Sequence, residues 1–296
     1  MSIPVPLAWP DFIDDWRIPD QAFSDAYASL SDFERSWIKK NIAQLYALHP
    51  PNRLRSSDHR TDWTAGFQTR HMLQPRPWAV VLLSAINASP ARTLAALLPA
   101  MTAGIPKILV VLRQQAGWDA LLLTSLELCG AEVVCHMDDP TILDTLRRMT
   151  ELDANGTILA LDDVDTLFLD AEPAFAGVDV WRLQAGLPIR IWHETPDEWE
   201  WNVLLRNHPA TPLEVWGPLQ DQAPNSIQPN SGTWDQFCRG SRVTLGVGSH
   251  LLSDTALPST GLIFTPGQEG CWFWPNLPAD VFYLHGMVLA CSNAYS

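Results

Sequence analysis

Four short apolar runs, whose starts lie 24 to 30 residues apart, constrain the fold of this chain more than any other feature. They are PWAVVLLS, KILVVL, AEVVCHM and GTILAL, and all lie between residues 77 and 161. The three segments between them have helical patterns that begin with a capping residue or a proline, and two of them end in glycine. Apolar strands that alternate with helices are typical of a parallel sheet covered on both faces. We therefore predict a Rossmann-like α/β fold.

The rest of the chain divides around this region into three predicted segments. Residues 1–65 form an N-terminal helical segment, in which Ser31 and Glu34 have the spacing of a capping box before an amphipathic helix. Residues 66–170 form the Rossmann-like half. Residues 171–296 form a second, smaller α/β half with a loop-rich tail, because the strand-like runs are shorter there and prolines are denser after residue 185.

Charge and cysteine usage limit the partners and the compartment. The 296 residues have a formal net charge of −14 and a sequence pI of about 4.8, which disfavours nucleic acid and anionic membrane surfaces as partners. Five cysteines without a C-x-x-C spacing are typical of reduced thiols rather than of disulfides or a zinc knuckle. The N-terminus lacks the pattern of a signal peptide, so we expect a cytoplasmic protein.

The turn after the first predicted strand is where a Rossmann fold usually holds a dinucleotide. Here it reads SAINASPAR and contains no glycine, although a G-x-G-x-x-G turn is needed for the backbone to approach a pyrophosphate. Asn87, Ser89 and Arg92 are nevertheless candidate ligand-binding residues, since the start of a helix can hold an anion. Helix capping explains Asn87 and Ser89 equally well, so we expect no bound cofactor.

The order of several segments resembles that of the histidinol dehydrogenases, whose fold is related to that of the aldehyde dehydrogenases. The matching segments are PAMTAGIPKILVVL, LELCGAEVVCHM, VDVWRLQAGLPIRIWHE, VLLRNHPATPLEVW, APNSIQP, GVGSHLL and ALPSTGLIFTPG. Their common order covers roughly residues 75–280. The resemblance implies the α/β fold of that family and a crevice that holds its substrate.

The same resemblance implies that the zinc and acid–base residues of the family are missing. His208 matches a zinc-ligand histidine of the family, but Leu205 stands where the ligand glutamine would be. His250 matches the substrate-side histidine, but Val243 stands where a ligand aspartate would be. Leucine and valine cannot coordinate zinc.

Asn225 and Ser226 stand where the glutamate–histidine pair of the family carries out acid–base work. Asparagine cannot exchange a proton at neutral pH. We therefore predict a protein with no metal that is not an active dehydrogenase and binds a small ligand with residues that include His208, Asn225, Ser226 and His250. The alternative is an NAD(P)-linked oxidoreductase or acyl-reductase-like enzyme that uses Cys238 as a thiolate, activated by Arg239 or Arg242.

Three further interpretations follow from other groups of residues. A metal site could be formed by His193, Glu194, His208 and His250, although zinc sites usually have tighter spacing. Asp162, Asp163 and Asp165 could hold a cation or a ribose, and otherwise make an acidic turn. The aromatic residues of segment 271–283 could form a lid or an exposed apolar face through which copies of the chain associate.

Overall fold

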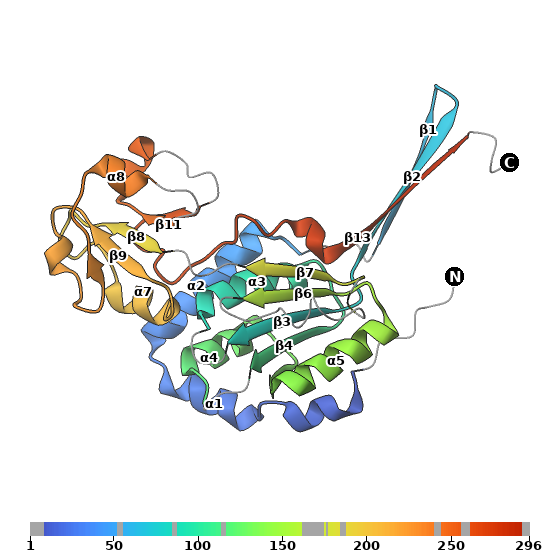
Figure 1. Ribbon diagram of the computed structural model, residues 1–296, viewed down its shortest axis with the longest axis horizontal. Coiled ribbons are helices and arrows are strands. Elements are labelled where there is room, and N and C mark those ends of the chain that lie inside the picture. The colour runs from blue at the N-terminus through green and yellow to red at the C-terminus, as the bar shows by residue number, and fades with distance from the viewer. Residues whose placement is uncertain are drawn as a thin grey trace.

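The computed structural model describes residues 9–51, 56–84, 88–113, 117–161, 175, 177–183, 188–239, 244–255 and 261–291. Two parallel sheets with flanking helices form the body, and a narrow three-stranded arm projects from it (Figure 1). The predicted α/β class is confirmed. No helix in this part of the chain is long and apolar enough to span a bilayer.

The first sheet is the predicted Rossmann-like sheet. Its strands have the spatial order β5-β4-β3-β6-β7, and all neighbours are parallel. Their bounds are β3 (Ala79–Ser84), β4 (Ile108–Arg113), β5 (Val134–Met137), β6 (Thr157–Leu161) and β7 (Asp179–Leu183). The first four are the four apolar runs of the sequence. β7 was expected in the second half, but it pairs with β6 and closes this sheet.

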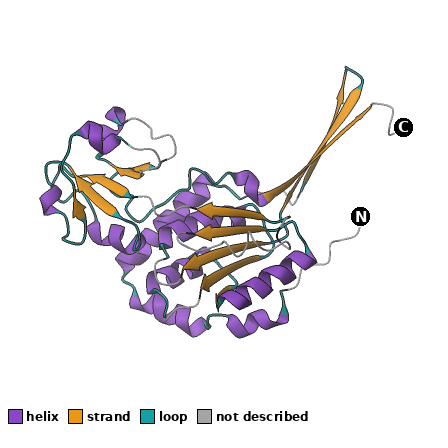
Figure 2. Ribbon diagram, viewed as in Figure 1, coloured by secondary structure: helices purple, strands orange, loops and turns teal. Residues whose placement is uncertain are grey.

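Helices lie on both sides of this sheet, as the unbroken apolar runs predicted (Figure 2). They are α3 (Pro90–Thr102), α4 (Ala120–Cys129) and α5 (Asp139–Leu152). Val81 and Leu83 belong to one core cluster with the residues of α3 and α4. Val80 and Leu82 point to the other face and belong to a second cluster with α5. The period of two along a strand therefore divides one apolar run between two buried faces.

The second sheet repeats the strand order of the first. It contains β8 (Ile189–Trp192), β9 (Leu213–Trp216), β10 (Gln228–Pro229), β11 (Thr244–Gly246) and β12 (Ile263–Phe264). The spatial order is β10-β9-β8-β11-β12, again with all neighbours parallel. The helical segments of this half are α7 (Trp201–Asn207), η3 (Gln220–Gln222), α8 (Trp234–Cys238) and η4 (Ser249–Asp254). In both sheets the first strand along the chain, β3 or β8, is central. The second and third strands lie on one side of it, and the fourth and fifth lie on the other side.

The N-terminal segment contains helices up to residue 48. It contains η1 (Asp11–Trp16), α1 (Asp20–Ser29) and α2 (Asp32–Leu48). The predicted capping box is present at the start of α2, where Ser31 and Glu34 each accept a hydrogen bond from the backbone N–H of the other. Residues 57–63 are not helical. They form β1 (Ser57–Trp63), which pairs with β2 (Phe67–Pro75) and belongs to the arm with β13 (Tyr283–Cys291).

Of the two interpretations offered for the aromatic segment 271–283, a lid or an exposed apolar face, its buried rings do not fit the exposed face. Trp272 and Trp274 are each 7% exposed and Phe282, in η5 (Ala279–Phe282), is 1% exposed. All three belong to the core cluster that contains α3. The guanidinium of Arg92 in α3 lies 4.3 Å from the ring centroid of Trp272, and its backbone carbonyl accepts a hydrogen bond from Trp274. The segment therefore packs its aromatic rings into the core beside α3.

Candidate functional site

The carboxyl edges of the two parallel sheets are where this architecture ordinarily holds a ligand. In open α/β sheets, ligands bind outside the carboxyl ends of the strands, at the point where the strand order reverses. That point lies between β3 and β6 in the first sheet and between β8 and β11 in the second. The two edges have different side chains, so each is described separately.

At the first edge, the start of α3 is buried and its polar groups are already paired. Ser89 is 2% exposed, accepts a hydrogen bond from the backbone N–H of Arg92 at 3.2 Å and donates one to the carbonyl of Asn207. Pro90 follows and has no N–H to offer. Ser89 is therefore a helix cap, and Arg92, also 2% exposed, lies against Trp272. Asn87 lies outside the described residues.

Two more helix starts lie at this edge in the described part of the chain, and both have acidic caps. Asp119 accepts a hydrogen bond from the backbone N–H of Leu122, and Asp138 accepts one from Thr141, both at 2.9 Å. Hydrogen bonds from Thr141 lower the pKa of the Asp138 carboxyl, which favours its ionised form. A carboxylate at these positions occupies the site that a phosphate would need and repels it. The described helix starts of the first sheet thus do not fit a dinucleotide.

At the second edge, two polar side chains meet although they are 56 residues apart in sequence. Glu194 follows β8 and His250 follows β11, and these strands are neighbours. His250 Nε2 lies 2.5 Å from Glu194 Oε1, while Glu194 Oε2 accepts a hydrogen bond from Trp192 Nε1 at 2.8 Å. A carboxylate only accepts hydrogen bonds, so this pairing puts an imidazole proton on Nε2, and in the neutral form of the ring Nδ1 is an acceptor.

A second carboxyl group, that of Glu198, lies beside this pair. Burial raises the pKa of the Glu198 carboxyl; the positive charge of His250 opposes the rise, whereas Glu194 and Glu269 add to it. Oε2 of Glu198 is buried and has no hydrogen-bond partner among the described residues. Gly248 makes room for the arrangement, because a Cβ there would lie 2.8 Å from His250 Cε1 and 2.9 Å from Glu198 Oε1. We call Glu194, Glu198 and His250 the β8/β11 site.

The β8/β11 site is open to solvent. The His250 side chain is 59% exposed and that of Glu194 is 27% exposed. An imidazole oriented by one carboxylate, with a second carboxyl beside it, can accept a hydrogen bond or a proton from a bound hydroxyl or ammonium group. Among the described residues, no three His, Cys, Asp or Glu side chains are placed to hold a metal ion.

His208, which the resemblance matches to a zinc ligand, does not face this site. It is 2% exposed, its Nε2 lies 3.2 Å from the carbonyl of Glu269 and its ring lies 5.3 Å from that of Trp272. Burial lowers the pKa of His208 to about 3, so it is neutral. Leu205 packs against the core. These two residues do not fit a zinc ion, and Val243 lies outside the described residues.

The remaining predicted residues lie apart from the site or outside the described part of the chain. Asn225 and Ser226 are exposed before β10, and no hydrogen bond between described residues joins them to His208 or His250. His193 is buried with its ring 5.3 Å from that of Trp201, so of the four residues of the possible metal site only Glu194 and His250 are in contact. Asp162, Asp163, Asp165 and Arg242 lie outside the described residues.

Cys238 does not have the environment of an activated nucleophile. It ends the short helix α8 and packs against the cluster of Phe237, Leu245 and Val247. Burial raises the pKa of the Cys238 thiol, and the carboxylate of Asp235 raises it further. Both effects favour the protonated thiol over the thiolate that nucleophilic chemistry requires.

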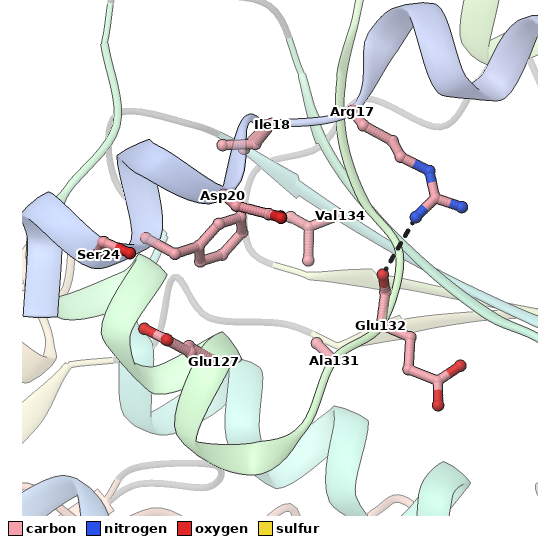
Figure 3. Close-up of a pocket in the computed structure, with 9 residues that line it drawn as sticks. Arg17, Ile18, Asp20, Ser24, Glu127, Ala131, Glu132 and Val134 are labelled. Carbon is pink, nitrogen blue, oxygen red and sulfur yellow. Dashed lines mark hydrogen bonds between the residues drawn. The ribbon is translucent and has the colours of Figure 1, made fainter.

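A separate pocket of about 230 Å³ lies at the opposite edge of the first sheet (Figure 3). Arg17, Asp20, Glu127 and Glu132 supply most of its polar lining, and Val134, the first residue of β5, closes one side. The pocket is therefore at the amino end of β5, not at the carboxyl edge. Its volume is below the roughly 300–1,000 Å³ of ordinary ligand pockets.

Comparison with solved structures identifies the fold. Over 94% of this chain and 77% of the other, the structure is similar to histidinol dehydrogenase from Elizabethkingia anophelis, with a TM-score of 0.57 and 12% identity. It is also similar to an NAD-dependent benzaldehyde dehydrogenase from Corynebacterium glutamicum, over 88% and 78% of the two chains, with a TM-score of 0.52 and 10% identity. No protein-family model and no curated protein matches the sequence. The fold is distantly similar to that of histidinol and aldehyde dehydrogenases, which confirms the resemblance seen in the sequence.

Proposed function

We propose that this chain is a small-ligand-binding member of the dehydrogenase fold that does not carry out zinc-dependent histidinol oxidation. The observation that carries the proposal is the contact between Glu194 and His250 at the strand-order reversal of the second sheet. Open α/β sheets ordinarily hold ligands at this point, and the two residues follow the neighbouring strands β8 and β11. A ligand there would donate a hydroxyl or ammonium hydrogen to His250 Nδ1 or to Glu198.

The residues implied for zinc and for the dinucleotide support the same proposal. His208 is buried against Trp272 and Leu205 has no donor atom, so the pair leaves no zinc site. Acidic caps begin α4 and α5. The NAD(P)-linked alternative needs a reactive Cys238, and burial raises rather than lowers the pKa of that thiol.

Thermal unfolding with a panel of small hydroxyl- and ammonium-bearing fragments, together with zinc chloride and histidinol, tests this proposal. A fragment at ten times its Kd stabilises the native state by about 1.4 kcal/mol, or roughly 2–4 °C. We expect such a shift with at least one fragment in the wild type and none in the Glu194→Gln and His250→Ala variants. Asp221→Asn, an exposed carboxylate change in η3, is the matched control and keeps the shift.

Two results would contradict the proposal. One is a fragment shift of equal size in the wild type and in both site variants, because the ligand would then bind elsewhere. The other is a shift with zinc that the His208→Ala variant loses, because His208 would then be a metal ligand.

A further inference from the structure

The contact between Glu194 and His250 lies beyond the hydrogen-bonded part of β8 and β11. The last pair in that ladder is Gly246 opposite Ile191. Glu194 follows the end of β8 by two residues, and His250 is the second residue of the six-residue 3-10 helix η4. Strand pairing therefore does not by itself fix the distance between the two side chains. Contacts made by the segments that follow the strands must do so.

Trp234, the first residue of α8, contacts the segments on both sides of the site. Figure 1 shows α8 next to β11 in the second half of the chain. On the β8 side, the Trp234 ring packs edge-to-face on that of Trp192, with ring centroids 5.0 Å apart and an interplanar angle of 88°. On the η4 side, Trp234 Nε1 donates a hydrogen bond at 3.3 Å to the carbonyl of Asp254, the last residue of η4. One indole thus joins the two segments that carry the site.

Each contact of Trp234 leads to one member of the pair. Trp192 Nε1 donates a hydrogen bond to Glu194 Oε2 at 2.8 Å, so the Trp192 ring orients the carboxylate whose Oε1 faces His250. The hydrogen bond to Asp254 holds the end of η4, four residues after His250. Binding groups keep a productive geometry when packing and hydrogen bonds from a surrounding layer of residues lock their side chains. Trp234 is placed to do this for both groups at once.

The Trp234 ring is itself held in place by the rest of α8. Thr233 and Gln236 form a capping box at the start of this five-residue helix. The Trp234 ring also lies 5.2 Å from that of Phe237, which is fully buried in the core of this half. A tryptophan has only two side-chain torsions, so a ring supported on two sides is a rigid spacer.

We propose that Trp234 is a positioning residue of the β8/β11 site, which sets the separation of Glu194 and His250 by holding Trp192 on one side and η4 on the other. The inference rests on the proposed function, because it takes this pair as ligand-binding groups. Loss of the indole should weaken the interaction between the two side chains, and through it the binding of a ligand, although both binding groups remain.

A mutant cycle on the free energy of unfolding tests this role without any ligand. Urea unfolding at pH 7 of the wild type, Glu194→Ala, His250→Ala and the double variant gives the interaction energy of the pair. For a pair as exposed as this one, the interaction should change the unfolding equilibrium constant about threefold. In the Trp234→Ala background, the same cycle should give less than about 1.5-fold. A tryptophan with a merely structural role would lower stability but leave the interaction energy unchanged.

Two phenylalanine variants give a matched comparison. Trp234→Phe keeps a ring against Trp192 but loses the hydrogen bond to Asp254, so it should reduce the interaction to about twofold. Trp216→Phe keeps a ring in the same aromatic cluster but loses its hydrogen bond to Glu214, which belongs to β9 and not to the site. It should keep the threefold interaction of the wild type. Trp234→Phe also takes the place of Trp234→Ala if circular dichroism shows that the alanine variant is unfolded.

Fragment affinity is a second readout, and it separates this inference from the proposed function. A fragment that binds the wild type should bind Trp234→Ala about tenfold more weakly and Trp216→Phe equally well. If no fragment binds the wild type, the proposed function fails, and the unfolding cycle still decides the role of Trp234. An interaction of the pair that is equal in the wild type and Trp234→Ala, that is lost equally in Trp216→Phe, or that is absent from the wild type would each overturn the proposal.

Discussion

The two parallel sheets have the same strand order but different side chains at their carboxyl edges. At the edge of the first sheet, the described helix starts are capped by Ser89, Asp119 and Asp138. At the edge of the second, Glu194 and His250 meet in an exposed pair. Strand order thus determines where a ligand site can form, whereas the side chains at that edge decide whether one does. The first sheet acts as the scaffold and the second holds the candidate site.

The largest effect expected from this comparison is on the free energy of unfolding, when a residue packed against the first sheet is changed. Leu97 in α3 is fully buried against the first sheet, so Leu97→Ala should lower the free energy of unfolding by about 2–5 kcal/mol. Leu152→Ala, at a residue that is 58% exposed near the end of α5, should change it by less than about 0.5 kcal/mol. Urea unfolding measures both. Ligand affinity of the folded Leu97→Ala chain should remain within twofold of the wild type, and a tenfold loss would contradict the separation of roles.

The second prediction concerns His208, which follows α7 in the second half of the chain and lies beside Ser89, the cap of α3 in the first half. Its pKa is about 3 in the folded chain and 6.5 without burial, so folding keeps it neutral while the unfolded chain takes up a proton. The stability it provides is complete above pH 6.5 and is lost as pH falls toward 3. Between pH 7 and pH 5 the loss is about 2 kcal/mol. Urea unfolding of wild type and His208→Gln at both pH values tests this; equal pH dependence in the two chains would refute it.

A smaller effect is expected at Gly248 in the β8/β11 site. A methyl group there would come within 2.8–2.9 Å of His250 and Glu198, and the exposed histidine can turn away. Gly248→Ala should therefore cost less than about 1 kcal/mol of stability but weaken fragment binding about tenfold. Gly177→Ala, whose new methyl meets only Ala154 at 3.6 Å, is the control. Unchanged binding in Gly248→Ala, measured by calorimetry, would show that the site is not where the ligand lies.

The smallest effect is expected at Glu198. Its pKa is raised in the folded chain, so its contribution to stability is complete below pH 4.5 and declines as pH rises. Glu198→Gln removes that decline and should stabilise the chain at pH 7 by less than about 1 kcal/mol, with no gain at pH 4. Thermal unfolding at the two pH values is the measurement, and Glu200→Gln, at an exposed residue, is the control. Destabilisation at pH 7 would mean that attraction to His250 outweighs the cost of burying the carboxylate, and would contradict the prediction.

The first sheet could be predicted from sequence because its strands are buried on both faces. Unbroken apolar runs such as VVLL and LVVL are typical of strands that helices cover on both faces. The helices between these runs begin with their own capping residues. The arm could not be predicted in this way. β1 reads SDHRTDW, with no apolar alternation, because neither of its faces covers a core. The burial of Trp272 and Trp274 depends on α3, about 180 residues earlier, which local sequence does not reveal.

The candidate site was predicted only in part. His250 was singled out from the resemblance, and Glu194 only as a member of a possible metal site with His193, His208 and His250. Their contact depends on β8 and β11 being neighbours, which the sequence spacing does not indicate. His208 was predicted at the crevice because the resemblance aligns it there, but it packs against Trp272. The clearest missed signal is Gly248, two residues before His250, because only a residue without a side chain lets the histidine and Glu198 come so close.

Calorimetric titration of the full chain with NAD and with NADP tests the central claim most directly. In our account the start of α3, where a pyrophosphate would lie, is buried and capped by Ser89, and the neighbouring helices α4 and α5 begin with acidic caps. We therefore predict no saturable binding up to about 1 mM of either nucleotide. Stoichiometric binding with a Kd below about 100 μM would contradict it. Such a result would mean that the first sheet holds a cofactor, and that the two sheets do not divide into scaffold and site.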